Sequence, residues 1–264
     1  MNLYALPQIW PRPESHVVMF MTYCFEKAYS PTSIASYISG LSFFHKINGW
    51  YSIADVFVVR KLLQGCRRLR PVVDKRAPIT VSMLRQICTI MPTITYTYYE
   101  TVLFKALFTV AFFGLFRVGE LVDTTSGNAP IMVDSTQINL AKTHVSLVLK
   151  VTKNNQYGHP MCIKLPCESE KLICPVNNLG IFLAMRPRSN GNLFIHENMQ
   201  SVTRCQFSSV LNKVLSQLGF NCKVYKTHSF RIGRATQLAS MGFPDEVIMR
   251  LGRWKSDAFM SYIR

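Results

Sequence analysis

The sequence has 264 residues, of which 48% are hydrophobic and 17% are charged. This composition excludes an intrinsically disordered chain and allows one large domain or two modest domains with their own cores. The net charge is +16, and both parts of the chain are basic: 10 basic and 4 acidic residues precede Ala77, and 20 and 10 follow from there. This charge favours a polyanionic partner such as nucleic acid, although an acidic membrane surface or a ribosomal partner would also fit.

The apolar segments are too short to cross a membrane. The longest, 106–116, has 11 residues, whereas a membrane-spanning helix needs about 20. Prolines at positions 7, 11 and 13 break the first apolar stretch, so no secretory signal is expected. The sequence therefore predicts a protein without a membrane segment.

The chain contains 8 cysteines. In a basic chain of this size without a signal, free thiols in a cytosolic or nuclear protein are favoured over disulfides. His159, Cys162, Cys167 and Cys174 lie close together in the sequence, but their spacing matches no zinc pattern. We therefore expect no metal here.

The first part of the chain predicts short helices over 15–28, from Ser30 onward and over 56–70. Ser30 is a good N-cap, with Pro31 at the first helical position. Apolar residues from Ile34 to Phe44 then repeat at helical spacing, which predicts one apolar face, and Gly49 ends the stretch. The third helix carries basic side chains that either form a solvated face or contact DNA phosphates. They are Arg60, Lys61, Arg67, Arg68 and Arg70.

A domain boundary is expected over 70–78, which has two prolines, mixed charge and no periodicity. Beyond it, Thr80 caps a helix, and 99–121 is predicted as one long apolar helix. Residues 131–165 change to the alternating pattern of a small antiparallel hairpin. The chain is helical again from Val202, with stops at Gly219, Gly242 and Gly252.

Several side chains in this second part could bind an anion. Arg117, at the end of the long apolar helix, needs an anionic partner, which is either Glu120 three residues on or a phosphate. His228 and Arg231 are three residues apart, on one face of a helix that begins there. That helix start also offers N–H groups to an anion, but a surface histidine beside an arginine is equally compatible with the pattern.

Two further residues complete the set. Tyr262 lies in a short helix that Ser256 caps, where a lone tyrosine usually serves only packing. Lys153 sits where the first strand enters the hairpin turn, with Lys150 nearby as an alternative. A lysine at such a turn is normally solvated, yet it can reach into a cleft.

The ordered set resembles the tyrosine recombinase (phage integrase) family. The set comprises an arginine, a hairpin lysine, His-x-x-Arg, Gly-Arg-Trp and a near-terminal tyrosine, all after a basic helical region. The resemblance covers nearly the whole chain. The segments 116–121, 227–231 and 251–262 carry the resemblance. The sequence of the segment 251–264, LGRWKSDAFMSYIR, is most similar to those of recombinases from eukaryotic mobile elements of the DIRS, Ngaro and Crypton kind.

The resemblance implies a mainly α fold with a small antiparallel β-sheet. A helical core-binding domain (1–72) would grip double-stranded DNA, and a tyrosine recombinase catalytic domain (77–264) would cut it. Active complexes of such enzymes are usually tetramers on paired sites. A DNA substrate implies a nuclear location if the source is eukaryotic and a cytoplasmic one otherwise.

The resemblance also implies the roles of the site residues. Tyr262 would attack the DNA phosphodiester, and Arg117 and Arg231 would stabilise the negative charge that develops on its oxygens. His228 would assist proton transfer at the tyrosine, and Lys153 would protonate the leaving 5′ oxygen. The 3′-phosphotyrosine product conserves the bond energy, so neither a metal nor another cofactor is expected.

The chain departs from the family pattern at one position. The family has His or Trp nine residues before the tyrosine, where this chain has Arg253, followed by Trp254. We favour Trp254 for the role beside the phosphate.

Two other functions are compatible with the sequence. The first is a catalytically inactive DNA-binding protein derived from a mobile-element recombinase. The second is a helix-turn-helix transcription factor built on 232–253, with a turn at Gly242 and Pro244, although it leaves Arg117 and the hairpin unexplained.

Overall fold

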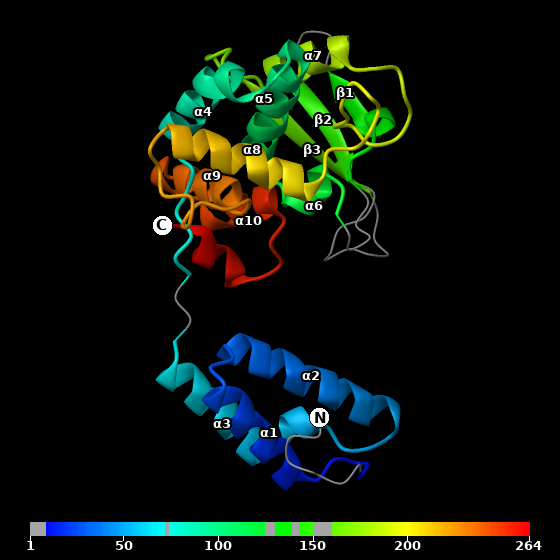
Figure 1. The fold of residues 1–264 in the computed structure, drawn as a ribbon, viewed down its shortest axis with the longest axis vertical. Helices are drawn as coiled ribbons and strands as arrows, with labels where there is room; N and C mark the ends of the chain where they lie inside the picture. Colours follow the sequence, from blue (N-terminus) through cyan, green and yellow to red (C-terminus); the bar gives the residue numbers. More distant parts are fainter. Residues whose placement is uncertain (1–8, 72–73, 125–129, 139–142, 150–159) are drawn as a thin grey trace. The chain divides into compact units, whose positions relative to one another are not determined.

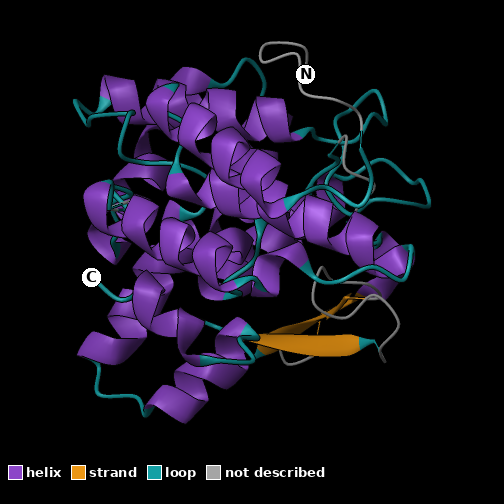
Figure 2. Cartoon of the chain, turned by 90° about the horizontal axis from the view of Figure 1, so that it is seen from below, coloured by secondary structure: helices purple, strands orange, loops and turns teal. Residues whose placement is uncertain are grey.

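The computed structural model describes residues 9–71, 74–124, 130–138, 143–149 and 160–264. The chain divides into two compact units, Met1–Asp74 and Lys75–Arg264. This division falls within the segment 70–78 that was expected as a boundary. The described residues are mostly helical and include one small antiparallel sheet (Figure 2), which confirms the predicted fold class.

The first unit contains α1 (Glu14–Glu26), α2 (Pro31–Ile47), the short 3₁₀ helix η1 (Ile53–Asp55) and α3 (Phe57–Leu69) (Figure 1). The predicted start of α2 is confirmed, because the Ser30 hydroxyl accepts a hydrogen bond from the Ser33 N–H at 3.1 Å. Pro31 follows at the first helical position, where a missing N–H costs nothing.

The core of this unit is small. The buried side chains come from all four elements: Val17, Met21, Cys24, Ile34, Ile38, Ile53, Val59 and Cys66. The predicted apolar face of α2 is only partly buried, since Tyr37 and Phe44 are 44% and 40% exposed. A small domain has too little interior to cover a wide apolar face.

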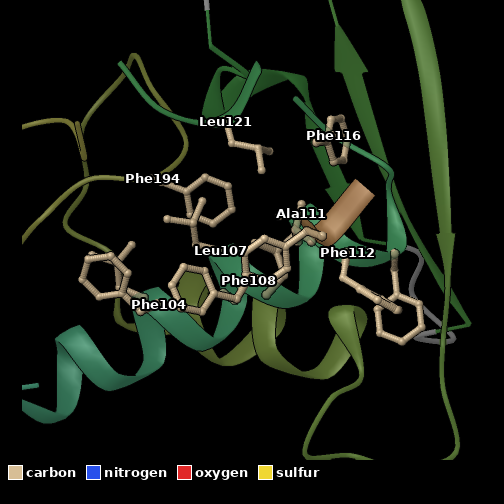
Figure 3. Close-up of a cluster of buried hydrophobic side chains, with 14 of the residues drawn as sticks. Phe104, Leu107, Phe108, Ala111, Phe112, Phe116, Leu121 and Phe194 are labelled. Carbon is tan, nitrogen blue, oxygen red and sulfur yellow. The ribbon is translucent and has the colours of Figure 1, made fainter. Parts of the chain in front are cut away.

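The second unit is built around α5 (Tyr98–Phe113), in which every residue from Thr101 to Phe113 except Lys105 is buried. A helix that is apolar on all sides must be surrounded by other elements. Figure 3 shows its phenylalanines Phe104, Phe108 and Phe112, with Phe194 from a distant part of the chain among them. None of the helices that the structure describes has the length and apolarity needed to cross a membrane.

The elements around α5 are α4 (Val81–Ile94), α7 (Pro175–Met185), α8 (Arg204–Gln217) and α9 (Ser229–Ser240). The predicted cap at Thr80 is confirmed, because its hydroxyl accepts a hydrogen bond from the Met83 N–H at 3.2 Å. Two short elements close the chain: α10 (Asp245–Gly252) and the 3₁₀ helix η3 (Asp257–Tyr262).

The prediction of one helix over 99–121 is wrong. The chain leaves α5 at Gly114 and begins a separate short helix, α6 (Val118–Leu121), after Arg117. Leu115, in between, has φ +48°, a left-handed conformation that a continuous α-helix excludes. Arg117 therefore precedes a helix rather than ending one.

The sheet has three antiparallel strands in the order β1 (Thr136–Ile138), β2 (His144–Leu149) and β3 (Met161–Pro166), with the 3₁₀ helix η2 (Val133–Ser135) before β1. Val145, Leu147 and Leu149 alternate with partly exposed residues and face the core, as the sequence pattern predicted. The hairpin turn, including Lys153, lies outside the described residues.

An extended segment before α4 packs directly on α9. The Ala77 N–H donates to the Val224 carbonyl at 2.9 Å, and the Ile79 N–H donates to the Ser229 carbonyl at 3.0 Å. A Cβ on Gly233 would lie 1.8 Å from the Ile79 carbonyl oxygen, so only glycine permits this approach. The start of the second unit is thus fixed against the helix that carries His228 and Arg231.

Candidate active site

Arg117 and Glu120 form one end of a charged cluster. The Glu120 carboxylate accepts hydrogen bonds from the Arg117 backbone N–H at 2.8 Å and from its guanidinium at 3.2 Å. The Glu120 side chain is 7% exposed, whereas that of Arg117 is 23% exposed. The partner that the sequence offered for Arg117 is therefore present, and its guanidinium still reaches the surface.

Arg231 lies in the first turns of α9 and is completely buried. Its guanidinium donates to the backbone carbonyls of Leu115, at 2.6 Å, and of Gly252. Among the described residues, no carboxylate lies within ion-pair distance of it. Burial first, and then the like charges of Arg117 and Arg253, lower the pKa of Arg231 to about 9, so it stays charged at neutral pH.

Arg253 also points inward. Its side chain is 6% exposed and donates to the carbonyls of Gly114, at 2.9 Å, and Leu115, at 3.0 Å, and to Glu120 at 2.8 Å. Glu120 thus bridges Arg117 and Arg253, and the Leu115 carbonyl is shared by Arg231 and Arg253. Two guanidinium groups therefore contact one carboxylate, and the third, that of Arg231, is joined to Arg253 through a shared carbonyl.

Trp254 covers the buried arginine. Its ring lies 4.1 Å from the Arg231 guanidinium carbon and 5.0 Å from the Tyr262 ring. A Cβ on Gly252 would lie 1.6 Å from the Trp254 ring, so the glycine is needed for this ring position. Of the two residues open at the family's His or Trp position, Trp254 lies beside Arg231 and Tyr262, while Arg253 is held by carbonyls and Glu120.

Tyr262 ends η3 and lies over the same group. Its ring is 5.4 Å from the Arg231 guanidinium carbon and stacks beside His228, with ring centroids 6.5 Å apart. The Ser256 hydroxyl accepts a hydrogen bond from the Ala258 N–H at 3.5 Å, as expected of the cap, although the helix is 3₁₀ rather than α. The phenol, the imidazole and the buried guanidinium therefore share one site.

His228 is the N-cap residue of α9 and is partly buried. Burial first, and then the positive charges of Arg76, Arg231, Arg117 and Arg204, lower its pKa to about 4. At neutral pH the imidazole is uncharged and able to accept a proton.

Of the catalytic candidates, Arg117, His228, Arg231, Trp254 and Tyr262 come together; Lys153 lies outside the described residues. Sequence reasoning missed the inward position of Arg253 and the charges of Arg76 and Arg204 near His228. It offered Glu120 only as a partner of Arg117. The only sequence signal for the carboxylate that Arg117 and Arg253 share was the position of Glu120, three residues after Arg117.

The basic candidates of α3 differ among themselves. Arg60, Lys61, Arg67 and Arg68 are exposed. Arg70 instead donates to the Phe25 carbonyl and lies over the Phe25 ring, 3.9 Å from its centroid. Its guanidinium thus holds α3 against the end of α1.

The cysteine-rich segment forms no cation site in the part of the chain that the structure describes. No three His, Cys, Asp or Glu residues gather there as metal ligands would. His159 lies outside the described residues.

No protein-family model and no curated protein matches the sequence. Solved structures do match in fold. The Tn1549 transposon integrase in complex with circular intermediate DNA matches with a TM-score of 0.65 and 13% identity, over 100% of this chain and 84% of that one. XerH site-specific recombinase bound to a palindromic difH substrate gives a TM-score of 0.66 and 12% identity, over 96% and 69%.

A lambda integrase dimer bound to a COC′ core site gives a TM-score of 0.59 and 13% identity, over 98% of this chain and 67% of that one. At these identities the likeness concerns the fold. The chain therefore has the fold of the site-specific tyrosine recombinases and integrases, across both of its units.

Proposed function

We propose that this protein is a tyrosine-type DNA strand transferase that cuts and rejoins double-stranded DNA through a 3′-phosphotyrosine intermediate. The observation that carries the proposal is the convergence of Tyr262, His228 and Arg231 with Arg117. Tyr262 lies beside both His228 and Arg231. Arg231 is linked to Arg117 through the Leu115 carbonyl, Arg253 and Glu120.

The charges of the cluster suit an attack on phosphorus. Arg117 and Arg253 share the Glu120 carboxylate, and Arg231 has only backbone carbonyls as acceptors among the described residues. The site therefore keeps a positive charge that a phosphodiester would balance. Extra negative charge develops on the phosphate oxygens when an oxygen attacks phosphorus. Preorganised guanidinium groups stabilise that charge more than they stabilise the ground state.

The proposed reaction balances without an external energy source. The Tyr262 oxygen bonds to phosphorus while the bond to the 5′ oxygen breaks, and the phenol proton passes to the neutral imidazole of His228. By the family resemblance, Lys153 protonates the leaving 5′ oxygen. A 5′ hydroxyl from another strand reverses the reaction, so ATP and a metal ion are not needed.

Arg231 is covered by Trp254 and Tyr262 in this structure, so a phosphate first meets the more exposed Arg117. Full engagement of Arg231 then requires the tyrosine ring to move aside from the guanidinium. Since Tyr262 lies in the cluster of its own chain, we propose that each subunit cuts with its own tyrosine. By the same resemblance, the active assembly is a tetramer on paired sites, and the source is a mobile element of the DIRS, Ngaro or Crypton kind.

The test is covalent capture. Duplexes with a randomised core and a nick beside each possible cleavage position trap the intermediate, because the short 5′ fragment is lost. The wild type should give a protein–DNA band that survives denaturation, with or without EDTA. The DNA should be attached to the tryptic peptide 256–264, whose one tyrosine is Tyr262.

Tyr262→Phe should abolish the band, whereas Tyr225→Phe, a tyrosine packed on Phe220, should keep it. Native gel shifts of the same duplexes provide the second readout. DNA binding without any covalent band in the wild type would exclude the strand transferase and leave the non-catalytic DNA-binding protein.

A further inference from the structure

Two cysteines of the second unit, Cys167 and Cys174, lie close together. The sulfur atoms of Cys167 and Cys174 lie 3.5 Å apart, at the two ends of the loop between β3 and α7. Free thiols at this distance need only small side-chain rotations to reach bonding distance. Cys162 and Cys205 are exposed as well, but among the described residues neither has a sulfur–sulfur contact like that of the pair.

The two thiols of the pair differ in environment. Cys167 is exposed, whereas Cys174 is buried. The Cys174 sulfur is the N-cap acceptor of α7 and receives the backbone N–H of Glu168 at 3.3 Å and of Asn177 at 3.4 Å. N–H groups at a helix start stabilise a thiolate. The hydrogen bond with Cys174 raises the pKa of the Cys167 thiol, and either sulfur can be the donor of that bond.

We propose that Cys167 and Cys174 are a reversible thiol–disulfide site that reacts with small-molecule disulfides. Cys167 is the accessible entry sulfur and Cys174 the resolving sulfur. This inference is independent of the DNA reaction.

The exchange balances in two steps. The Cys167 sulfur attacks the small disulfide, forming a mixed disulfide and releasing one thiol. The Cys174 thiol then loses its proton and attacks the Cys167 sulfur, and the second small thiol leaves with that proton. The protein loses two electrons and two protons, and the small disulfide becomes two thiols.

The disulfide would close the loop 167–174, and hydrogen bonds of Glu168 and Glu170 already restrain this loop. Glu170 accepts two 2.7 Å hydrogen bonds from Arg85 of α4, and the Glu168 N–H donates to the Cys174 sulfur at 3.3 Å. Because these contacts restrain the loop, the sulfur atoms stay close. Intramolecular closure should therefore be faster than attack by a second external thiol.

The experiment treats the native protein with glutathione disulfide, blocks remaining thiols and digests with trypsin. The expected product is a disulfide joining peptide 165–171, which contains Cys167, to peptide 172–188, which contains Cys174. Cys162→Ser, a control that removes an exposed thiol from β3, just before the pair, should form this link equally well. Dithiothreitol should restore both free thiols.

Cys174→Ser should instead retain a glutathione adduct on Cys167, because the resolving sulfur is gone. Cys167→Ser, an exposed and conservative change, should leave Cys174 unmodified in a folded protein. A lasting adduct on Cys167 in the wild type, with Cys174 still free to be blocked, would overturn the proposal. So would a wild-type yield of the linked peptide no higher than that of disulfides involving Cys162 or Cys205.

Discussion

The Glu120 carboxylate supplies the counter-charge for two of the three arginines in the site. It is buried and lies 2.8 Å from Arg253 and 3.2 Å from Arg117. Removing one member of a buried charged group is costly because the others lose their counter-charge. The stability of the second unit should therefore depend strongly on this carboxylate.

Glu120→Gln keeps the shape of the side chain but removes its charge. We expect it to lower the free energy of unfolding by about 3 kcal/mol, and Arg253→Met to have a similar effect. The double variant should lose less than the sum, with a coupling of about 1–3 kcal/mol. Urea unfolding of the four proteins measures the coupling.

The exposed ion pair of Arg85 and Glu170 provides the control. Its side chains are 48% and 35% exposed, so removing it should cost less than about 1 kcal/mol despite its two 2.7 Å hydrogen bonds. Strictly additive effects at Glu120 and Arg253 would mean that the two side chains do not stabilise each other.

His228 makes stability depend on pH. An unperturbed histidine titrates near 6.5, and in the folded protein the pKa is about 4. Between these values the unfolded chain binds a proton that the folded chain does not, so stability falls as the pH drops from about 6.5 towards 4. His228→Gln should reduce the loss between pH about 7 and about 5 by about 1 kcal/mol, allowing for solvent screening. Equal losses in both proteins would contradict a neutral His228.

At the residue scale, the ordered set of motifs and its family resemblance selected Arg117, His228, Arg231 and Tyr262 as candidates, and the fold brings their side chains together. The acceptors of these side chains were not predictable in the same way. Arg231 donates to a carbonyl 116 positions earlier in the chain. Arg253 reaches a carboxylate 133 positions earlier. Only the tertiary fold creates such pairs.

At the scale of elements, the break between α5 and α6 serves the site. Gly114 and Leu115 leave the helix, so their carbonyls are free to accept hydrogen bonds from Arg253 and Arg231. The apolar pattern of 99–121 predicted a continuous helix. Because α5 is buried on all sides, the residues on either side of its end are equally apolar, and no change of pattern marks where the helix stops. The caps at Ser30 and Thr80 were predictable because one side chain and a nearby N–H determine them.

The packing of α9 on the segment before α4 gives a prediction for an element. Gly233→Ala places a methyl group against the Ile79 carbonyl oxygen, so the backbone of Ile79 must move away. The hydrogen bond that the Ile79 N–H donates to the Ser229 carbonyl is then lost. We expect a loss of about 2–3 kcal/mol in the free energy of unfolding. Gly40→Ala, in α2 with nothing within 4 Å of the new methyl group, should instead gain about 0.5–1 kcal/mol. A neutral Gly233→Ala would mean that the segment does not rest on α9.

At the scale of the whole molecule, the net charge of +16 includes two groups of basic residues in different environments. Arg231 and Arg253 are buried in the candidate active site, whereas the basic residues of α3 are exposed to solvent. Arg60, Lys61, Arg67 and Arg68 all lie on exposed positions of one helix. If the protein binds DNA as proposed, these two groups should affect different measurements: the buried arginines affect chemistry, and α3 affects affinity.

Phosphate contacts make DNA binding depend on salt, because each neutralised phosphate releases counterions and adds about 0.9 to the slope of log affinity against log salt. Arg67→Gln with Arg68→Gln should therefore lower the slope by up to about 2, without changing the rate of covalent capture at saturating protein. Fluorescence anisotropy of a labelled duplex, from about 50 to about 200 mM salt, measures the slope. The matched pair is Lys27→Gln with Lys46→Gln, whose charges already lie 5.9 Å from the Tyr23 ring and 3.9 Å from Asp55. Because both double variants remove the same net charge, an equal fall in slope would mean that the overall field, and not contact by α3, holds the DNA.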